Sequence, residues 1–106
     1  MREIDNEEDL AGILRAVRRV FVLFYASWCP FCIRFLPLFE EYSRKFSDEF
    51  LRARIDDEMN PLWEKYGVMV VPTVVLFEDG SVKRRLDGVL GSGLSEEQLG
   101  DFLESA

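Results

Sequence analysis

The sequence predicts an α/β sandwich in which a parallel βαβ unit is followed by a ββα unit. Three observations predict it: an apolar run at Val20–Ala26 that is continuous rather than alternating, apolar residues at helical spacing on both sides of that run, and a hairpin signal at Asp79-Gly80. With 106 residues and 48% apolar content, the chain is near the common size of one domain. We therefore expect a single domain over residues 1–106.

The first half of the chain is predicted to form a helix, a strand and a second helix. Asp5 or Asn6 can cap a helix whose apolar stripe continues to Val17, because short polar side chains accept hydrogen bonds from the first free N–H groups. Val20–Ala26 has the length of one strand and the composition of a strand buried on both faces. The second helix is expected to cover Pro30–Ser47, since proline suits the first turn.

The second half is predicted to form a strand, a short helix, a hairpin and a last helix. Phe50–Asp56 alternates apolar and charged side chains, as a strand with one polar face does. Met59–Tyr66 is a short helix followed by a glycine that can end it. Val74–Leu86 is predicted to form a hairpin whose turn is Asp79-Gly80. Ser95 and Gln98 have the spacing of a capping box, which marks the start of a helix.

Composition excludes several classes of function. The chain has no histidine, so a Ser-His-Asp triad, a Cys-His dyad and an HExxH zinc site are all ruled out. The net charge of -7 argues against nucleic acid or an anionic membrane as a partner, because both attract basic surfaces. Two cysteines cannot supply the four thiolates of a closed zinc or iron–sulfur site. We expect no metal and no cofactor apart from the cysteine pair itself.

Nothing in the sequence predicts a membrane span or an export signal. Residues 1–10 are acidic and lack the apolar core of a signal peptide. The longest apolar run, Val20–Ala26, is far shorter than the roughly 20 residues that cross a bilayer. We therefore expect a cytoplasmic protein. In a reducing compartment a close cysteine pair is more often catalytic, sensing or metal-binding than structural.

Cys29 and Cys32 stand where the buried strand ends and a helix begins. A thiolate on Cys29 would face the free N–H groups and positive end of that helix, which favours the charged form. Cys32, one turn further along, would be more buried and would keep its proton longer. This arrangement predicts a thiol–disulfide oxidoreductase. Cys29 would be the nucleophile that attacks a disulfide, and Cys32 would resolve the mixed disulfide from within the same molecule.

The cysteine pair has other possible uses. As a structural staple, its four-residue ring would constrain the unfolded chain by only roughly 2 kcal/mol. A metal site shared by two chains, each giving its pair, is chemically possible, and so is a redox-sensing binding module without catalysis. The position of the pair on a strand-to-helix turn favours the enzyme over these alternatives.

From end to end the chain resembles the thioredoxin family. The matching segments are Val22–Ala26 with Trp28-Cys29-Pro30-Phe31-Cys32, Pro37, Ile55-Asp56, Lys65–Val68, Val71-Pro72-Thr73, Asp79-Gly80 and Gly88. The resemblance implies a thioredoxin fold, with a central mixed sheet flanked by helices. It also implies that Pro72 lies in a cis peptide facing Cys29, whereas the residue alone would indicate only a turn or strand-start proline.

The resemblance further implies how a substrate binds. The backbone of Val71 would pair with an extended substrate segment, and Trp28, Val71 and the loop near Gly88–Gly91 would form an apolar rim around Cys29. Taken alone, Trp28 could equally be a core residue. The implied partners are disulfide-containing proteins and a thioredoxin reductase-type or other electron donor, and we expect a monomer. The expected substrate-binding residues are Trp28, Pro30, Phe31, Val71, Pro72 and Gly88.

Two positions depart from the family pattern. Leu23 stands where thioredoxins usually carry a buried aspartate that helps to move the proton of the buried cysteine. The proton acceptor for Cys32 is therefore unassigned. Arg52 falls where thioredoxins have a lysine near that acid. Without a carboxylate partner, Arg52 is expected to be an exposed strand residue.

The two residues between the cysteines, Pro30-Phe31, replace the usual Gly-Pro of thioredoxins. They resemble the CPYC motif of glutaredoxins, and we predict a reduction potential above the thioredoxin value of about -270 mV. A glutaredoxin-like or a disulfide-forming or isomerising enzyme is therefore the alternative, although Thr73–Gly80 is thioredoxin-like. Arg34 either stabilises the Cys29 thiolate or points to solvent.

Overall fold

The computed structural model describes residues 1–106 and contains one five-stranded sheet in the order β1-β3-β2-β4-β5. The strands are β1 (Arg2–Ile4), β2 (Arg19–Tyr25), β3 (Glu49–Arg54), β4 (Thr73–Glu78) and β5 (Ser81–Leu86). The first three are parallel to one another, while β4 is antiparallel to both β2 and β5. The sheet is therefore mixed, which confirms the fold class predicted from the sequence.

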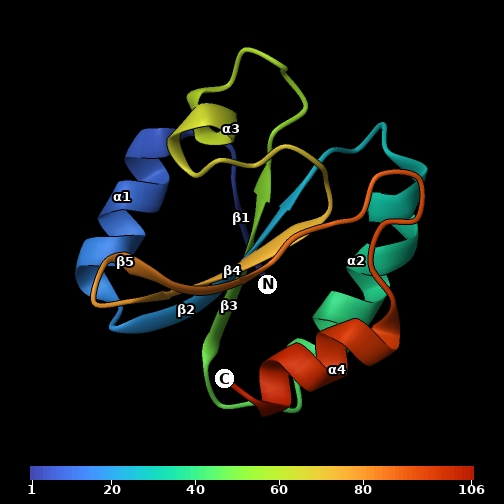
Figure 1. Ribbon diagram of the computed structural model, residues 1–106. Helices are drawn as coiled ribbons and strands as arrows, with labels where there is room; N and C mark the ends of the chain where they lie inside the picture. Colours follow the sequence, from blue (N-terminus) through green and yellow to red (C-terminus); the bar gives the residue numbers. More distant parts are fainter.

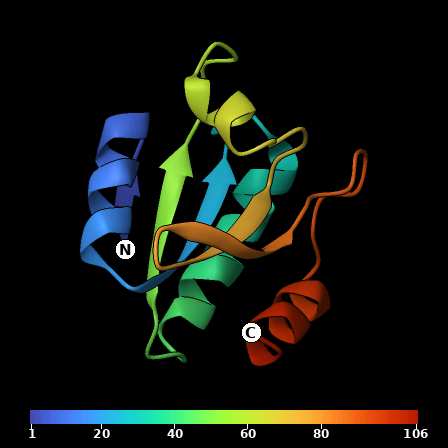
Figure 2. The ribbon, with the colours of Figure 1, turned by 60° about the vertical axis from the view of Figure 1, so that its left-hand side comes forward.

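Helices cover both faces of the sheet. They are α1 (Glu7–Ala16), α2 (Pro30–Ser43), α3 (Pro61–Lys65) and α4 (Glu96–Glu104). Figure 1 shows the sheet nearly edge-on, with α1 and α3 on one side and α2 and α4 on the other. In Figure 2, β2 and β3 lie side by side and point towards the end of the molecule that carries α3. None of the helices has the length and apolar character that a membrane crossing requires.

The continuous apolar run forms the central strand β2, and its position explains its composition. Helices lie over both faces of the sheet, so side chains of either parity along β2 are buried, including Leu23 and Phe24. Phe21 stacks on Phe50 of β3 with ring centroids 5.0 Å apart. Phe35 and Phe39 of α2 are also fully buried. The core is therefore aromatic-rich on the α2 side, directly below the helix that the cysteines begin.

The structure confirms the predicted helix caps and the predicted hairpin turn. Asn6, rather than Asp5, caps α1, and its side chain accepts a hydrogen bond from the backbone N–H of Asp9 at 2.8 Å. Asp79 and Gly80 have φ values of 54° and 82°, as a tight hairpin turn between β4 and β5 requires. The capping box at the start of α4 is complete.

The predicted end of α2 near Ser47 is wrong, because the helix ends at Ser43. The hydroxyl of Ser43 donates to the carbonyl of Glu40 at 2.6 Å, a local hydrogen bond that competes with continuation of the helix. Phe46 still packs against the core from beyond the helix end. Apolar spacing therefore continues past the last helical residue, which made the helix look longer in the sequence.

The predicted order of elements is also wrong at its beginning, because β1 precedes α1. Arg2–Ile4 pairs in parallel with Leu51–Ala53 of β3 at the edge of the sheet. Only Ile4 of these three residues is buried. A strand this short shows no periodicity, and its stability comes from pairing with a partner that is remote in the sequence.

Arg52 is not the unpartnered residue that the sequence predicted. Its Nη1 lies 2.6 Å from Oε1 of Glu40 on α2, and its Nε lies 3.0 Å from Oε1 of Glu3 on β1, in an ion pair without hydrogen-bond geometry. Arg52 and Leu23 are register partners on adjacent strands, so both point to the α2 face of the sheet. The carboxylates that balance Arg52 thus come from α2 and β1 and not from β2.

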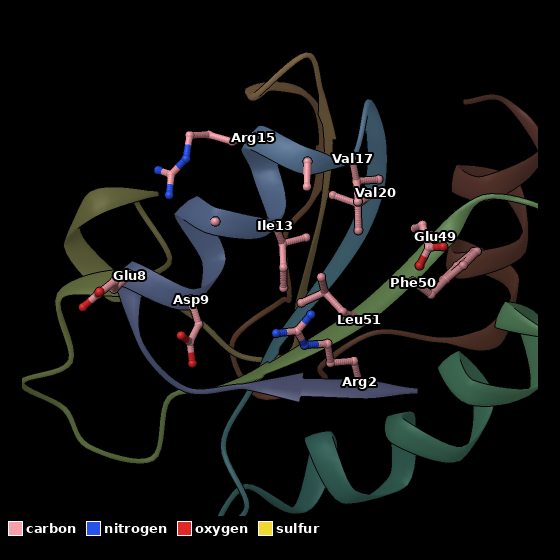
Figure 3. A pocket seen from close by; sticks show the side chains of 12 residues that line it. Arg2, Glu8, Asp9, Ile13, Arg15, Val17, Val20, Glu49, Phe50 and Leu51 are labelled. Atoms are coloured by element: carbon pink, nitrogen blue, oxygen red, sulfur yellow. The ribbon is translucent and has the colours of Figure 1, made fainter.

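A cavity of about 480 Å³ lies between α1 and the amino ends of the parallel strands. Figure 3 shows Ile13 and Leu51 in its interior, with the charged side chains of Glu8 and Arg15 further out. The cysteines follow the carboxyl end of β2. This cavity is therefore at the opposite end of the sheet and does not belong to the cysteine site.

Candidate redox site

Cys29 lies at the junction between β2 and α2. The buried strand ends at Tyr25, and four residues later Cys29 is the N-cap of α2, with Pro30 as the first helical residue. The Cys29 side chain makes no capping hydrogen bond to the helix. Its position nevertheless places the sulfur at the end of α2 where unpaired N–H groups carry partial positive charge.

The segment before β4 lies beside Cys29 because of the sheet register. Phe24 near the end of β2 pairs with Thr73 at the start of antiparallel β4, so the residues before Thr73 lie next to the carboxyl end of β2. The Val71-Pro72 peptide is cis, as the resemblance implied. The thiol of Cys29 donates to the carbonyl oxygen of Val71 at a distance of 3.7 Å.

Cys32 lies in the first turn of α2 and is completely buried, whereas Cys29 keeps 7% of its surface exposed. Both cysteines are free thiols. Burial, with further contributions from Cys29 and the negative charge of Asp56, raises the pKa of Cys32 to about 12, although a backbone hydrogen bond with Ala26 acts in the opposite direction. Cys32 is thus more buried than Cys29, as expected, and this burial favours its protonated form.

We expect the second thiol of the reduced protein to resist alkylation at neutral pH. Because the native pKa of Cys32 is raised to about 12, its reaction with iodoacetamide should accelerate roughly tenfold per pH unit up to that value, in step with the thiolate fraction. The protonated thiol also stabilises the reduced fold below pH 9, and this contribution is lost as the pH rises from 9 towards 12. Mass spectrometry of the timed reaction measures both thiols.

The same reaction in denaturant is the control for this prediction, since unfolding removes the burial of Cys32. There the two thiols should react at similar rates, with thiolate fractions set by the ordinary cysteine pKa. Equal rates for both thiols in the native protein below pH 9 would contradict the raised pKa.

An apolar hollow of about 200 Å³ lies over Cys29, and nine of its ten lining residues are hydrophobic. Trp28 is 56% exposed, and Met69 and Leu90 on the other side are more than 80% exposed. Large apolar side chains gathered at an exposed hollow mark a surface that binds other molecules. The lining residues are Trp28, Cys29, Phe31, Trp63, Met69, Val70, Val71, Val89, Leu90 and Gly91.

Three of the residues expected to bind substrate line this hollow, namely Trp28, Phe31 and Val71. The other three lie behind it or beside it. Pro72 is buried, and Gly88 packs so closely on it that an added Cβ would lie 2.3 Å from the Pro72 carbonyl oxygen. Pro30 is exposed on the first turn of α2. The exposed Trp28 side chain is not the core residue that the sequence alone left possible.

The loop near Gly88–Gly91, expected at the rim, lines the hollow through Val89, Leu90 and Gly91, whereas sequence reasoning missed Trp63, Met69 and Val70. Trp63 comes from α3, and its Nε1 donates to the carbonyls of Ile55 and Asp57 at 3.2 Å each. Met69 belongs to a loop without periodicity. Its only sequence signal is that it is a large apolar residue close to Pro72, and such residues are equally common in a core.

Arg34 is exposed, and the carbon at the centre of its guanidinium lies 5.3 Å from the ring centroid of Phe31. It takes part in none of the ion pairs of the structure, which leaves its charge free beside the hollow. Its influence on the Cys29 thiolate stays a prediction. No group of three or more Cys, Asp or Glu side chains is placed to bind a metal ion.

Comparisons with known proteins agree with this geometry. The Thioredoxin family profile matches residues 3–105. A thioredoxin of Mycoplasmoides gallisepticum is 31% identical over 100 residues, which is 93% of this chain and 99% of that protein. A bifunctional thioredoxin reductase/thioredoxin of Mycobacterium leprae is 28% identical over 95% of this chain and 22% of its own length. The X-ray structure of Fasciola hepatica thioredoxin superposes with a TM-score of 0.83 at 27% identity, covering 99% and 98% of the two chains.

Proposed function

Because the chain belongs to the thioredoxin family and is a thiol–disulfide oxidoreductase, we propose that it reduces disulfides in other proteins, acting as one domain over residues 1–106. The observation that carries the proposal is the asymmetry of the two thiols. Cys29 is partly open at the start of α2, inside an apolar hollow, while Cys32 is fully buried one turn further along. The Cys29 thiol can contact a substrate disulfide, whereas the Cys32 thiol can react only with the sulfur of Cys29.

The proposed cycle uses the two cysteines in sequence. The Cys29 thiolate attacks one sulfur of a substrate disulfide, a mixed disulfide forms, and the other substrate sulfur leaves as a thiolate that takes up a proton. Cys32 then loses its proton and attacks the Cys29 sulfur. The Cys29–Cys32 disulfide forms, and the second substrate thiol leaves. Two electrons have moved from the protein dithiol to the substrate.

The hollow supports the proposed substrate contacts. Trp28, Phe31 and Val71 would contact an extended segment on either side of the disulfide, with the Val71 backbone free to pair with it once the Cys29 thiol no longer donates to its carbonyl. Pro72 and Gly88 would shape the floor from behind, and Pro30 would stand at the rim. Contacts that are apolar or made by backbone select little, so the substrate range is broad.

The electron donor would be a dithiol reductase that returns the disulfide to two thiols with two electrons and two protons. The relative from Mycobacterium leprae, which is named for both a thioredoxin reductase and a thioredoxin, supports a donor of this kind. We propose that the chain works as a monomer in the cytoplasm, where thiols are kept reduced. It needs no cofactor in this scheme, because the dithiol itself carries the electrons.

Reduction of insulin by dithiothreitol, followed by turbidity, tests the proposal. The protein at micromolar concentration should shorten the lag before precipitation, because Cys29 reduces the interchain disulfides faster than dithiothreitol does. A rate equal to that of dithiothreitol alone would reject a disulfide reductase.

Redox equilibrium with glutathione then separates the reductase from the oxidising alternative. A potential between the thioredoxin value of about -270 mV and the glutaredoxin range of about -200 to -230 mV fits a reductase with the Pro30-Phe31 pair. A value near the -120 mV of strongly oxidising relatives would favour a disulfide-forming enzyme instead.

A further inference from the structure

Asp56 follows β3 and holds the segment that leads into Cys29. Its Oδ1 accepts a hydrogen bond from the backbone N–H of Ser27 at 2.7 Å, and its Oδ2 accepts one from the Ser27 hydroxyl at 2.5 Å. Ser27 lies two residues before Cys29 and makes no other hydrogen bond. One carboxylate therefore fixes both the backbone N–H and the hydroxyl of the residue at which the chain leaves the sheet.

The backbone around Asp56 also holds both tryptophans of the hollow. The Nε1 of Trp28 donates to the Asp56 carbonyl at 2.9 Å. The Nε1 of Trp63 donates to the carbonyls of Ile55 and Asp57, on either side of Asp56. The Asp56 side chain and the surrounding carbonyls thus join the loop before Cys29 to the wall opposite it.

Ion pairs behind Asp56 connect it to the edge of the sheet. Nε of Arg54 lies 4.0 Å from Oδ2 of Asp56, and Nη1 of Arg54 lies 3.9 Å from Glu3 on β1. Glu3 pairs in turn with Arg52, which pairs with Glu40 on α2. Charged side chains thus connect Asp56, through Arg54, Glu3 and Arg52, to α2.

The Asp56 carboxyl is ionised at neutral pH. Partial burial of the carboxyl favours its neutral form, but the hydrogen bonds from the Ser27 hydroxyl and amide outweigh burial, and the pKa of Asp56 lies below its ordinary value. A charged acceptor makes the stronger kind of hydrogen bond to both groups of Ser27.

We propose that Asp56 is a positioning residue for the redox pair, whose carboxylate fixes Ser27 and thereby holds Cys29 at the start of α2 beside the Val71 carbonyl. The inference rests on the proposed function, since it concerns the sulfur that would attack the substrate. The Asp56 carboxylate makes its hydrogen bonds to Ser27 and none to the sulfur of Cys29, while the Asp56 carbonyl accepts the bond from Trp28. Attack on a disulfide depends on the alignment of three sulfurs, so a loosened loop lowers the rate without removing any reacting group.

Two substitutions of Asp56 separate this role from loss of charge. Asp56→Ala removes both acceptors, and kcat/KM for insulin reduction should fall about tenfold. Asp56→Asn keeps an oxygen for the Ser27 N–H and an NH₂ group that can donate to the Ser27 hydroxyl oxygen. Its kcat/KM should stay within about threefold of the wild-type value. An Asn variant as slow as the Ala variant would overturn the proposal.

Glu58→Ala is the matched control, because Glu58 is an exposed carboxylate of the same loop that makes no hydrogen bond or ion pair. It should leave the rate unchanged. If Glu58→Ala slows the enzyme as much as Asp56→Ala does, charge near the hollow explains the effect and positioning does not.

Ser27→Ala tests the same contact from its other side, without touching the ion pairs. It should slow the reaction less than Asp56→Ala, and the double variant should be no slower than Asp56→Ala alone, because both remove one shared contact. If the double variant is slowed by the product of the two single-variant factors, the inference is overturned.

Alkylation of Cys29 by iodoacetamide needs no disulfide substrate and separates this inference from the proposed function. If the wild type fails to reduce insulin, the proposed function fails. The alkylation rate should still differ between the wild type and Asp56→Ala. Identical rates in those two proteins and in Asp56→Asn would overturn the positioning role, and urea unfolding at the assay temperature establishes that each variant is folded.

Discussion

The Cys29→Ser protein should show no reduction of insulin above the dithiothreitol background, a loss of at least about 10³-fold, because a hydroxyl cannot replace the thiolate as nucleophile at neutral pH. Serine is close to cysteine in size, and Cys29 lies at the surface end of α2 with 7% of its area exposed. The fold should therefore persist, and the free energy of unfolding should change by less than about 1 kcal/mol. Turbidity and urea unfolding measure the two quantities.

Cys32→Ser is the matched variant, and it should fail in a different way. Cys29 is still present, so the first attack takes place, but no second thiol releases the product. A covalent adduct with the substrate should accumulate to about one per molecule and disappear on addition of excess dithiothreitol. Undiminished turnover in Cys29→Ser, or an adduct with Cys29→Ser and none with Cys32→Ser, would contradict the assignment of the two roles.

Elements with a strong local signal were predictable from the sequence. The run that forms β2 is apolar on both faces because helices cover both, and the Asp79-Gly80 turn needs two residues that tolerate positive φ. The position of the cysteine pair was predictable for a related reason. The pair lies on the turn between a strand and a helix that both have strong local signals.

Features that depend on contacts between remote segments were not predictable. β1 is stable only because it pairs with β3, and the partners of Arg52 lie on β1 and α2. The same holds for Asp56, which the family resemblance marked but whose bond to Ser27 joins residues 29 positions apart. Three carboxylates that look like ordinary surface charges in the sequence thus join remote segments: Glu3 and Glu40 at Arg52, and Asp56 at Ser27.

The absence of histidine constrains the chemistry more sharply once the structure is considered. No imidazole can accept the Cys32 proton, and Leu23, fully buried on the α2 face, provides no carboxyl beneath it. The pKa of Cys32 is raised to about 12 mainly by burial, so few molecules carry its thiolate at neutral pH. In the proposed cycle, the substrate thiolate released in the first step is a base that can accept this proton.

Leu23→Asp should lower the free energy of unfolding by about 4 kcal/mol at pH 7, since it removes a fully buried apolar side chain and buries a carboxyl in its place. Arg52 is the register neighbour of this position, but its guanidinium is already engaged by Glu40 and Glu3. In a protein whose Arg52 were free, the same carboxyl would gain a partner. Urea unfolding of the reduced protein measures the loss.

Leu23→Asn is the control for the charge in this experiment, because it buries a neutral polar group of nearly the same size. Burial raises the native pKa of the introduced carboxyl above its unfolded value of about 3.9. The Asp variant should therefore approach the Asn variant below pH 4 and become less stable than it as the pH rises through the native pKa. An Asp variant as stable as the wild type at pH 7 would mean that Arg52 leaves Glu40 to pair with the new carboxyl. Arg52 would then be able to exchange its partners. The pairing of Arg52 with Glu40 and Glu3 would no longer explain why an uncharged residue is found at position 23.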